Sequence, residues 1–375
     1  MDFSYTDEQI MLRDSVSRLM RQRYDFDTRQ AIVQSDEPWS DDIWRALGEL
    51  GLFALPFSEE VGGLDGSACD SVAICEIFGA HLLVEPYVGS ILFAGGLIAA
   101  SGKAKSDEQI GALMSGIIAG ERLAAFAYEE GKGTSKPELI SCSARRTNGG
   151  YLLNGEKRMV LAGAEADTLL VAAWLEDETG NESALAVFLI PRKQNGVLVT
   201  PFSTIDGRSA AHIRFEDALV EANGLLSDDA LDLVESTINA AIVALCAEAV
   251  GAMGALFELT CEYANTRKQF GKSIIGFQAI AHKMADMKIA YIKLRSCLTY
   301  TTALAEAGRA TSRDISVLKA QVGKLGHFIG ETAIQIHGGV GMTDELSVGH
   351  YHKRLLTIDA LFGNSEYHFR VLGGE

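Results

Sequence analysis

Three long helical patterns near the C-terminus constrain the fold of this 375-residue chain more than any other feature. Apolar residues recur at spacings of three and four from Leu231 to about Tyr263, from Phe277 to about Ala307, and from Ile315 to Ile336. Helices this long and this apolar usually pack as a bundle, and their outer apolar stripes often pack on another subunit. We therefore expect residues 224–375 to form a helical bundle that also takes part in oligomer assembly.

The rest of the chain divides into two segments of different period. Residues 1–120 show helical patterns, which begin with the capping box Thr6-Asp-Glu-Gln9. Residues 121–223 contain short apolar and β-branched segments separated by turn sequences such as Asn148-Gly-Gly150 and Asn154-Gly155, which predicts a compact antiparallel β-domain. Its expected strands are Leu123–Tyr128, Leu139–Arg145, Tyr151–Leu153, Thr168–Trp174, Ala184–Ile190, Val197–Thr200 and His212–Phe215. The prediction is an α+β protein with domains at 1–120, 121–223 and 224–375.

The composition limits the partners of the chain. A formal net charge of −17 argues against nucleic acid and anionic membranes, since either partner needs a basic face. The acidic, polar N-terminus is not a signal peptide, and no apolar run approaches the roughly 20 residues that a membrane span needs. The six cysteines include no C-x-x-C pair, so we expect reduced thiols in a cytoplasmic protein rather than disulfides or metal ligands.

Three C-terminal motifs, Arg267–Gly271, Phe277-Gln278 and Gln335–Gly339, carry groups suited to a dinucleotide pyrophosphate. Arg267, in Arg267-Lys-Gln-Phe-Gly271, offers a planar fork of donors that matches a phosphate group. Gly338-Gly339, in Gln335-Ile-His-Gly-Gly339, lets the backbone approach a ligand closely because no Cβ intervenes. Taken singly, an arginine at a helix end and a glycine pair after a helix are more often caps. The cofactor-binding residues predicted from the motifs together are Arg267, Phe270, Gln278, Gln335, Gly338 and Gly339.

The order of helices, small β-domain and helical bundle, with RKQFGKSIIGFQAIAHKMAD at 267–286 and QIHGGVG at 335–341, resembles the acyl-CoA dehydrogenase family. The resemblance covers essentially the whole chain. In detail the chain is similar to the small subunit of bacterial pimeloyl-CoA dehydrogenases, through Asp25–Arg29, Ala244–Gly251 and Gly349–Gly363. The resemblance implies an N-terminal helical domain, a middle antiparallel β-barrel and a C-terminal four-helix bundle. It also implies an FAD cofactor and an acyl-CoA substrate, whose acyl group the sequence leaves open.

The position of the catalytic base departs from the family pattern. In the family, a carboxylate removes a Cα proton from an acyl thioester while flavin N5 takes the β-hydride, and that carboxylate must lie within reach of Cα. The matching position here is Phe362, and the alternative position used by some relatives is Ala241. Asp359 and Glu366 flank Phe362 and are weak candidates for a displaced base, although exposed structural carboxylates are the favoured interpretation. No catalytic residue is therefore predicted.

The flavin-ring and CoA contacts that the family implies are also missing. The family's Thr-Glu-Pro-Gly-x-Gly-Ser loop corresponds to 128–134 and begins here with Tyr128 in place of the small hydroxyl residue. Its Trp-Ile-Thr segment corresponds to Met159-Val-Leu161, which lacks both the aromatic platform and the hydroxyl. The helix arginine that usually meets the CoA portion falls on Ile242.

These losses follow the way in which the family shares each flavin between two subunits. One subunit supplies the ring contacts, the CoA pocket and the base, and its neighbour supplies the arginine and the Gln-x-x-Gly-Gly segment. The chain keeps the neighbour's half, which predicts a small, non-catalytic subunit of an α2β2 dehydrogenase whose large subunit carries the base. Two alternatives remain open: a self-sufficient homomeric dehydrogenase with a displaced base, and a dehydrogenase-like protein that binds a ligand or partner without catalysis.

Overall fold

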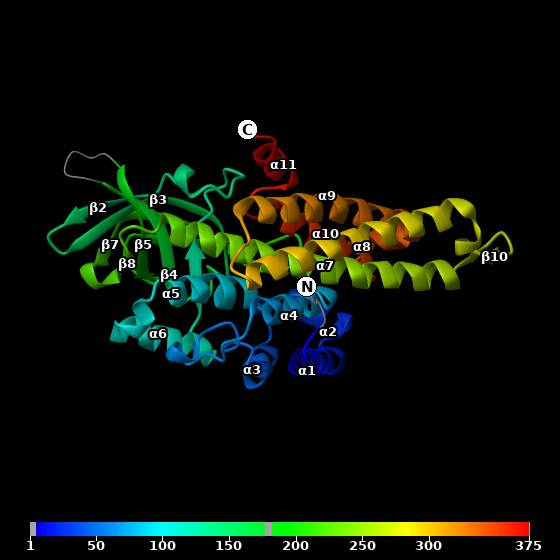
Figure 1. Ribbon diagram of the computed structural model, residues 1–375, viewed down its shortest axis with the longest axis horizontal. Helices are drawn as coiled ribbons and strands as arrows, with labels where there is room; N and C mark the ends of the chain where they lie inside the picture. The colour runs from blue at the N-terminus through cyan, green and yellow to red at the C-terminus, as the bar shows by residue number, and fades with distance from the viewer. Residues whose placement is uncertain (1–4, 177–181, 375) are drawn as a thin grey trace. The chain divides into compact units, whose positions relative to one another are not determined.

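The computed structural model describes residues 5–176 and 182–374 (Figure 1). Its contacts divide the chain into two compact units. Unit 1 comprises Met1–Ser35, Ser67–Val84 and Ile242–Glu375, and unit 2 comprises Asp36–Gly66 and Glu85–Ala241. The helical N-terminal segment expected over residues 1–120 is therefore distributed between both units. The division into three domains at 1–120, 121–223 and 224–375 stays a prediction.

Unit 1 is built from helices, among which α9 packs against α8, α10 and α11. The capping box that starts α1 forms as expected at Thr6, and a second capping box starts α9 at Thr311. The helices are α1 (Asp7–Arg23), α2 (Phe26–Gln34), α4 (Ala68–Ala80), the later part of α7 (Leu231–Thr266), α8 (Gln278–Glu306), α9 (Ser312–His337), α10 (Ser347–Ala360) and α11 (Ser365–Gly373). Between them lie the strands β9 (Lys268–Gln269) and β10 (Lys272–Ser273) and the short 3-10 turns η6 (Ile274–Gly276) and η7 (Gly338–Met342).

Helices α4 and α7 cross at glycine contacts. A Cβ added to Gly79 would lie 1.8 Å from the backbone oxygen of Glu248, and one added to Gly251 would lie 1.8 Å from that of Glu76. Next to this crossing, the Arg354 guanidinium donates from Nε and Nη2 to the two carboxylate oxygens of Glu248, each at 2.9 Å. Both partners are buried, so removing either would leave an uncompensated buried charge.

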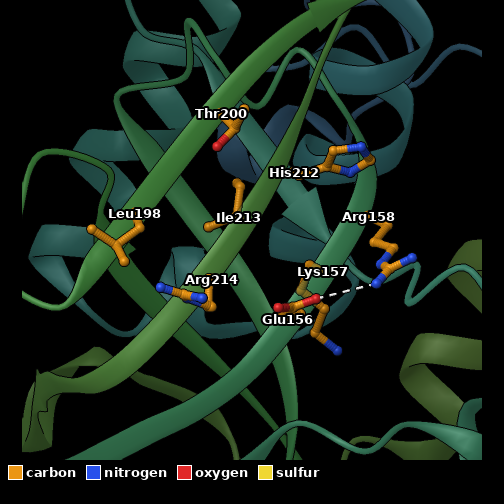
Figure 2. Close-up of a pocket in the computed structure, with 8 residues that line it drawn as sticks. All are labelled: Glu156, Lys157, Arg158, Leu198, Thr200, His212, Ile213 and Arg214. Carbon is orange, nitrogen blue, oxygen red and sulfur yellow. Dashed lines mark hydrogen bonds and ion pairs between the residues drawn. The ribbon is translucent and has the colours of Figure 1, made fainter.

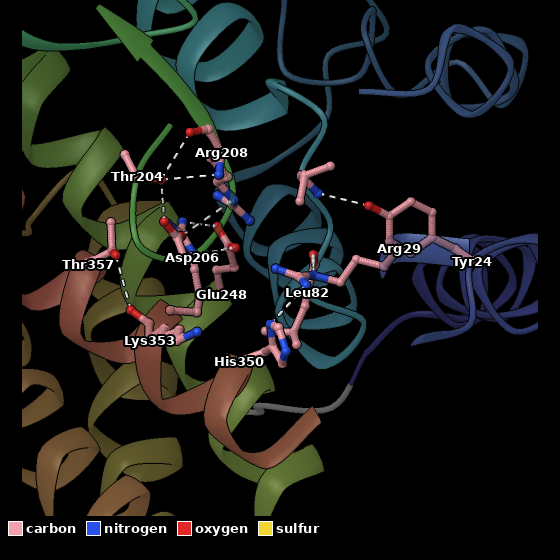
Figure 3. Close-up of polar contacts among 12 residues, drawn as sticks. Tyr24, Arg29, Leu82, Thr204, Asp206, Arg208, Glu248, His350, Lys353 and Thr357 are labelled. Carbon is pink, nitrogen blue, oxygen red and sulfur yellow. Dashed lines mark hydrogen bonds and ion pairs between the residues drawn. The ribbon is translucent and has the colours of Figure 1, made fainter. Parts of the chain in front are cut away.

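The motif Asp25–Arg29 has a structural role within unit 1, and Figure 3 shows its Arg29 with Leu82 and His350. Asp25 caps α2 by accepting a bond from the Thr28 N–H. Arg29 is 1% exposed, and its Nε donates to the Leu82 carbonyl at 3.2 Å. Its Nη1 lies 3.2 Å from Nδ1 of His350, a residue of the Gly349–Gly363 motif on α10. These motifs thus tie α2 to α10.

Unit 2 contains the β-domain and short helices. Its helical elements are α3 (Asp41–Glu49), η1 (Glu59–Val61), a π-helix η2 (Tyr87–Gly95), α5 (Gly96–Ala100), η3 (Lys103–Lys105), α6 (Glu108–Ile118), η4 (Pro137–Leu139), η5 (Ala222–Gly224) and the start of α7. Its strands are β1 (Ala124–Ala127), β2 (Ser143–Thr147), β3 (Gly150–Leu161), β4 (Thr168–Glu176), β5 (Glu182–Pro191), β6 (Val197–Ser203), β7 (Ser209–Glu221) and β8 (Leu225–Ser227). They pair in the order β6-β7-β3-β2-β4-β5-β8, with β1 on β4.

Two details of the sheet differ from the sequence prediction. The sheet is mixed rather than purely antiparallel, because β1 and β2 both pair with β4 in parallel. Asn154-Gly155 does not form a turn between strands but lies within β3, where the register shifts between Leu153 and Gly155. Gly155 has φ +136° and lies against Cys142, so the glycine allows an irregularity inside a long strand.

Helix α7 corrects the expectation about apolar runs. Within the described residues it is long and apolar enough to cross a membrane, judged by length and composition. However, 78% of its most apolar window is buried inside the structure, which is typical of a core helix.

Candidate functional site

The predicted dinucleotide residues of unit 1 begin where α7 ends. Arg267 directly follows the last helical residue and is exposed, and its backbone N–H donates to the Tyr263 carbonyl at 2.8 Å. Strands β9 and β10 then form a hairpin whose two-residue turn, Phe270-Gly271, has positive φ at both positions (+52° and +83°). Positive φ at both central residues is typical of a type I′ turn, which holds Phe270 93% exposed at the hairpin tip.

The chain returns from the hairpin to start α8 at Gln278, which is exposed. The Phe270 and Phe277 rings meet edge to face at 6.2 Å between centroids, and the Lys272 ammonium lies 4.3 Å from the Phe277 centroid. The aromatic rings of Phe270 and Phe277 and the Lys272 ammonium therefore lie in the segment between the exposed Arg267 and α8. Aromatic rings suit an adenine, and cations suit a phosphate.

The glycine motif lies at the C-terminal end of α9. Gln335 is exposed on the last turn, and Gly338 ends the helix with φ +66° and ψ −145°, which a side chain would disfavour. Gly338 and Gly339 are both exposed, and a Cβ built on either meets nothing within 4 Å. Backbone is therefore accessible at this turn. These residues fit a dinucleotide phosphate group, because an arginine fork, an aromatic face and open glycine backbone are all presented outward on one unit.

The position of the catalytic base is filled with apolar packing. Phe362 is 2% exposed and has φ +55°, and Gly363 follows with φ +83°. The buried Lys319 ammonium donates to the carbonyls of Asp359 (2.7 Å) and Gly363 (2.9 Å). The His368 Nε2 atom lies 3.1 Å from the Phe362 carbonyl. Lys319 and His368 thus hold this left-handed loop in one conformation.

The two flanking carboxylates differ in their surroundings. Asp359 is 8% exposed, so the expectation that it is an exposed carboxylate is wrong. One of its oxygens accepts a bond from the Ser365 N–H at 2.9 Å, and the other lies 3.2 Å from Nε2 of His327. Glu366 is exposed in the first turn of α11, as expected. Asp359 is therefore engaged in holding the start of α11 rather than presented to a substrate.

The positions that should contact a flavin ring are also occupied by the chain itself. Tyr128 is 3% exposed and its ring packs 5.9 Å from that of Phe126. The hollow beside the loop that follows Tyr128 measures only about 10 Å³. Met159 lies at a register shift of β3 with φ +53°, and Leu161 offers no hydroxyl. At the CoA position, Ile242 is buried and apolar. At these four positions the chain lacks the small hydroxyl residues, the aromatic platform and the arginine that the family uses.

A buried ion pair fixes this loop to β3. Lys157 is fully buried, and its ammonium donates to a carboxylate oxygen of Glu130 at 2.8 Å. Burial of Glu130 opposes its ionisation, but the Lys157 charge and the N–H groups of Ser141 and Cys142 outweigh burial and lower its pKa to about 2. Glu130 stands where the family loop has proline. This difference from the family pattern was a sequence signal of the Lys157–Glu130 pair, which the sequence analysis did not predict.

An open hollow of about 540 Å³ lies on strands β3, β6 and β7 (Figure 2). Arg158 pairs with Glu156 at 3.4 Å, and Arg214 pairs with Glu216 at 2.6 Å. These arginine charges are balanced locally, so this hollow is not a strong anion site. Within the described residues, no group of three or more His, Cys, Asp or Glu side chains is arranged to hold a metal ion.

Comparisons with known proteins place these features in a family. Three family models match successive parts of the chain: acyl-CoA dehydrogenase N-terminal domain (6–121), middle domain (125–218) and C-terminal domain (231–374). The chain is similar to acyl-CoA dehydrogenase FadE27 of Mycobacterium tuberculosis, with 26% identity across 100% of this chain and 98% of the relative.

Two solved structures share the fold. The ChsE4-ChsE5 complex from Mycobacterium tuberculosis contains a chain with a TM-score of 0.89 and 25% identity, covering 100% of this chain and 98% of that one. PigA with FAD and proline has a TM-score of 0.89 and 23% identity, with coverage of 100% and 98%. The predicted family, fold class and family cofactor, FAD, are confirmed. The closer resemblance to a pimeloyl-CoA dehydrogenase small subunit stays a prediction.

Proposed function

The chain belongs to the acyl-CoA dehydrogenase family, and we propose that within it this chain is the small, non-catalytic subunit of a heteromeric FAD-dependent enzyme. A larger partner subunit of the same fold carries the catalytic base, the ring contacts and the CoA pocket. The reaction is α,β-desaturation of an acyl-CoA thioester. The assembly is α2β2 and cytoplasmic.

One observation carries the proposal: the two halves of the family site have opposite fates in this chain. The side chains of the dinucleotide half, Arg267, Phe270, Gln278 and Gln335, are exposed, and the backbone at Gly338 and Gly339 is open. The ring and base positions, Tyr128 and Phe362, are buried apolar packing. A chain that catalysed alone would need the second half at least as much as the first, because the base must reach the substrate Cα while the flavin ring takes the β-hydride.

Each retained residue has a role toward the cofactor. Arg267 binds the pyrophosphate, the backbone at Gly338 and Gly339 approaches it, and Phe270 offers its exposed face to the adenine. Gln278 and Gln335 supply amide groups for the remaining polar edges of the dinucleotide. When bound, the flavin would serve as the hydride acceptor in the active site of the partner subunit.

The similarity to a chain of the ChsE4-ChsE5 complex supports a heteromeric assembly. The apolar side chains exposed on the C-terminal elements supply material for an interface with the partner subunit: Ile289, Ile292, Tyr300, Val317, Phe328, Val340, Met342 and Phe369. A partner subunit that covers these side chains would remove their apolar surface from water.

The first test compares the isolated chain with its assembled form. Expressed alone, the full chain should bind FAD weakly or not at all, so its purified absorbance spectrum should lack the flavin bands. Recovered through an affinity tag from the cells that naturally express it, the chain should carry a second dehydrogenase subunit and one flavin per pair of subunits. One tightly held flavin per isolated chain would refute the non-catalytic role.

The second test asks whether this chain reaches the shared cofactor. In the complex, Arg267→Ala should weaken flavin binding about 10- to 100-fold, the cost of a lost charge-assisted phosphate contact. Lys268→Ala is the matched control, since this neighbouring residue is also a cation exposed at the hairpin. Equal flavin content in wild type and Arg267→Ala would show that Arg267 does not contact the cofactor.

A further inference from the structure

We propose that Tyr263 and His337 are positioning residues that hold the arginine-bearing end of α7 against the glycine turn after α9, so that the phosphate cradle exists before any cofactor binds. The inference rests on the proposed function, which assigns Arg267 and Gly338-Gly339 to the dinucleotide. Neither aromatic residue was predicted from the sequence, although Tyr263 stands one helical turn before Arg267.

A stacked ring pair joins the two elements. The rings of Tyr263, on α7, and His337, the last residue of α9, lie 4.3 Å apart between centroids with an interplanar angle of 23°. The Tyr263 hydroxyl also approaches the His337 backbone carbonyl at 3.4 Å, which is long for a hydrogen bond. Stacking therefore carries most of the contact, and the hydroxyl adds little.

Each ring is anchored to the element whose position it sets. The Tyr263 backbone carbonyl accepts a hydrogen bond from the Arg267 N–H at 2.8 Å. This bond at the end of α7 fixes the position of Arg267 relative to Tyr263. His337 is 5% exposed, and its Nδ1 lies 2.9 Å from the Ala333 carbonyl, which fixes the ring on the last turn of α9. Burial lowers the pKa of His337, so at neutral pH the ring is uncharged and Nδ1 donates this bond.

Among the described residues, no atom of the chain fills the space beside the Gly339 backbone. Its φ is not in the left-handed region, and an added Cβ would meet no atom within 4 Å. Neither backbone conformation nor packing therefore requires glycine at this position in the free chain. A group from outside the chain that approaches the backbone closely would account for glycine at this position. The stacked pair joins the helix end that carries Arg267 to the turn that carries this open backbone.

The test uses the isolated full chain, with ADP as the probe of the adenine and pyrophosphate half of the cofactor. Calorimetry gives the affinity, and thermal unfolding checks each variant. Wild type should bind ADP saturably at millimolar concentrations or below, and Arg267→Ala should abolish that binding. Tyr263→Leu should weaken binding about tenfold, the upper range for loss of an aromatic pair, with little change in unfolding temperature. Tyr263→Phe keeps the stack and should restore the affinity.

Two further variants keep the inference falsifiable. Gly339→Ala should fold normally and yet lose ADP affinity, because its Cβ meets only the ligand. Should Tyr263→Leu fail to fold, His337→Gln removes the other ring while keeping a side-chain N–H for the Ala333 carbonyl, and the same loss of affinity is expected. Wild-type affinity in these ring-deleting variants, or no saturable ADP binding by wild type, would overturn the positioning role.

The failures of the two proposals are distinguishable. If Arg267→Ala loses ADP but Tyr263→Leu does not, the positioning role is wrong and the proposed function stands. If FAD binds the isolated chain far more tightly than ADP, the chain holds the flavin ring as well, and the non-catalytic role is wrong whatever Tyr263 does.

Discussion

Placing a carboxylate at position 362 tests how far this chain is from being a catalyst. Phe362→Glu restores the residue type that the family uses as its base. The substitution is expected to create no dehydrogenase activity in the isolated chain. The ring contacts remain absent at Tyr128, Met159 and Leu161, and the CoA position remains Ile242. A base without a bound flavin and thioester has nothing to act on.

The same substitution should destabilise the fold, and the structure sets the scale. Phe362 is 2% exposed, so losing its ring costs about 2–3 kcal/mol, below the 3–5 kcal/mol of a full truncation because the glutamate stem remains. Burial also raises the pKa of the new carboxyl group, and each unit of pKa shift costs about 1.4 kcal/mol. A rise of two units brings the total to about 5–6 kcal/mol, comparable to the whole stability of many domains.

The destabilisation should depend on pH in a defined direction. A carboxyl group whose pKa is higher in the folded state adds no charge penalty below its unfolded pKa of about 4.3. The penalty then grows as pH rises towards the folded pKa. Urea unfolding at pH 5 and pH 8 should therefore show a larger deficit at pH 8. Phe362→Leu is the matched control, because it loses ring packing without adding a charge and should show no such pH dependence.

The assay for activity combines an acyl-CoA substrate with an artificial electron acceptor. Measurable turnover by isolated Phe362→Glu, above that of wild type, would refute the reasoning about the missing ring site. Equal deficits at pH 5 and pH 8 would instead refute the burial argument, because the carboxylate would then be solvated.

Three other perturbations follow from the structure. In the assembled complex, Glu366→Gln and Asp359→Asn should leave turnover within about threefold. Asp359→Asn should also lower the free energy of unfolding by about 1.5–3 kcal/mol, because its charged hydrogen bonds are lost. A loss of turnover of about 10³-fold with flavin intact would identify a displaced base. Gly79→Ala should destabilise the chain severely, because the new Cβ would fall 1.8 Å from the Glu248 backbone oxygen. Gly96→Ala is the control and should not destabilise the chain, because its Cβ would meet nothing within 4 Å. Similar unfolding temperatures for the two variants would contradict the close helix crossing. Because the pKa of Glu130 is lowered to about 2, the stability that its carboxylate contributes is present above pH 4.5 and is lost as pH falls towards 2. Glu130→Gln should remove that part of the acid sensitivity in a series of denaturation measurements at different pH. An unchanged acid profile would count against the buried ion pair.

The sequence by itself determined the long helices. Apolar spacing placed α7, α8 and α9 to within a few residues, since a helix of many turns repeats its period often enough to be recognised. It also predicted segments that overlap β1 to β7, but it missed β8, β9 and β10. It could not determine that β1 and β2 pair in parallel with β4, because strand partners are chosen across long stretches of chain.

Tertiary structure alone decided how the residues of interest are used. The sequence located Asp359 beside Phe362 but could not show that its carboxylate is buried and accepts the Ser365 N–H. It located Arg267 and Gly338 but could not show that Tyr263 stacks on His337 between their elements. Residue type and spacing are local properties of a chain, whereas burial, hydrogen-bond partners and open space arise only when distant segments pack against one another.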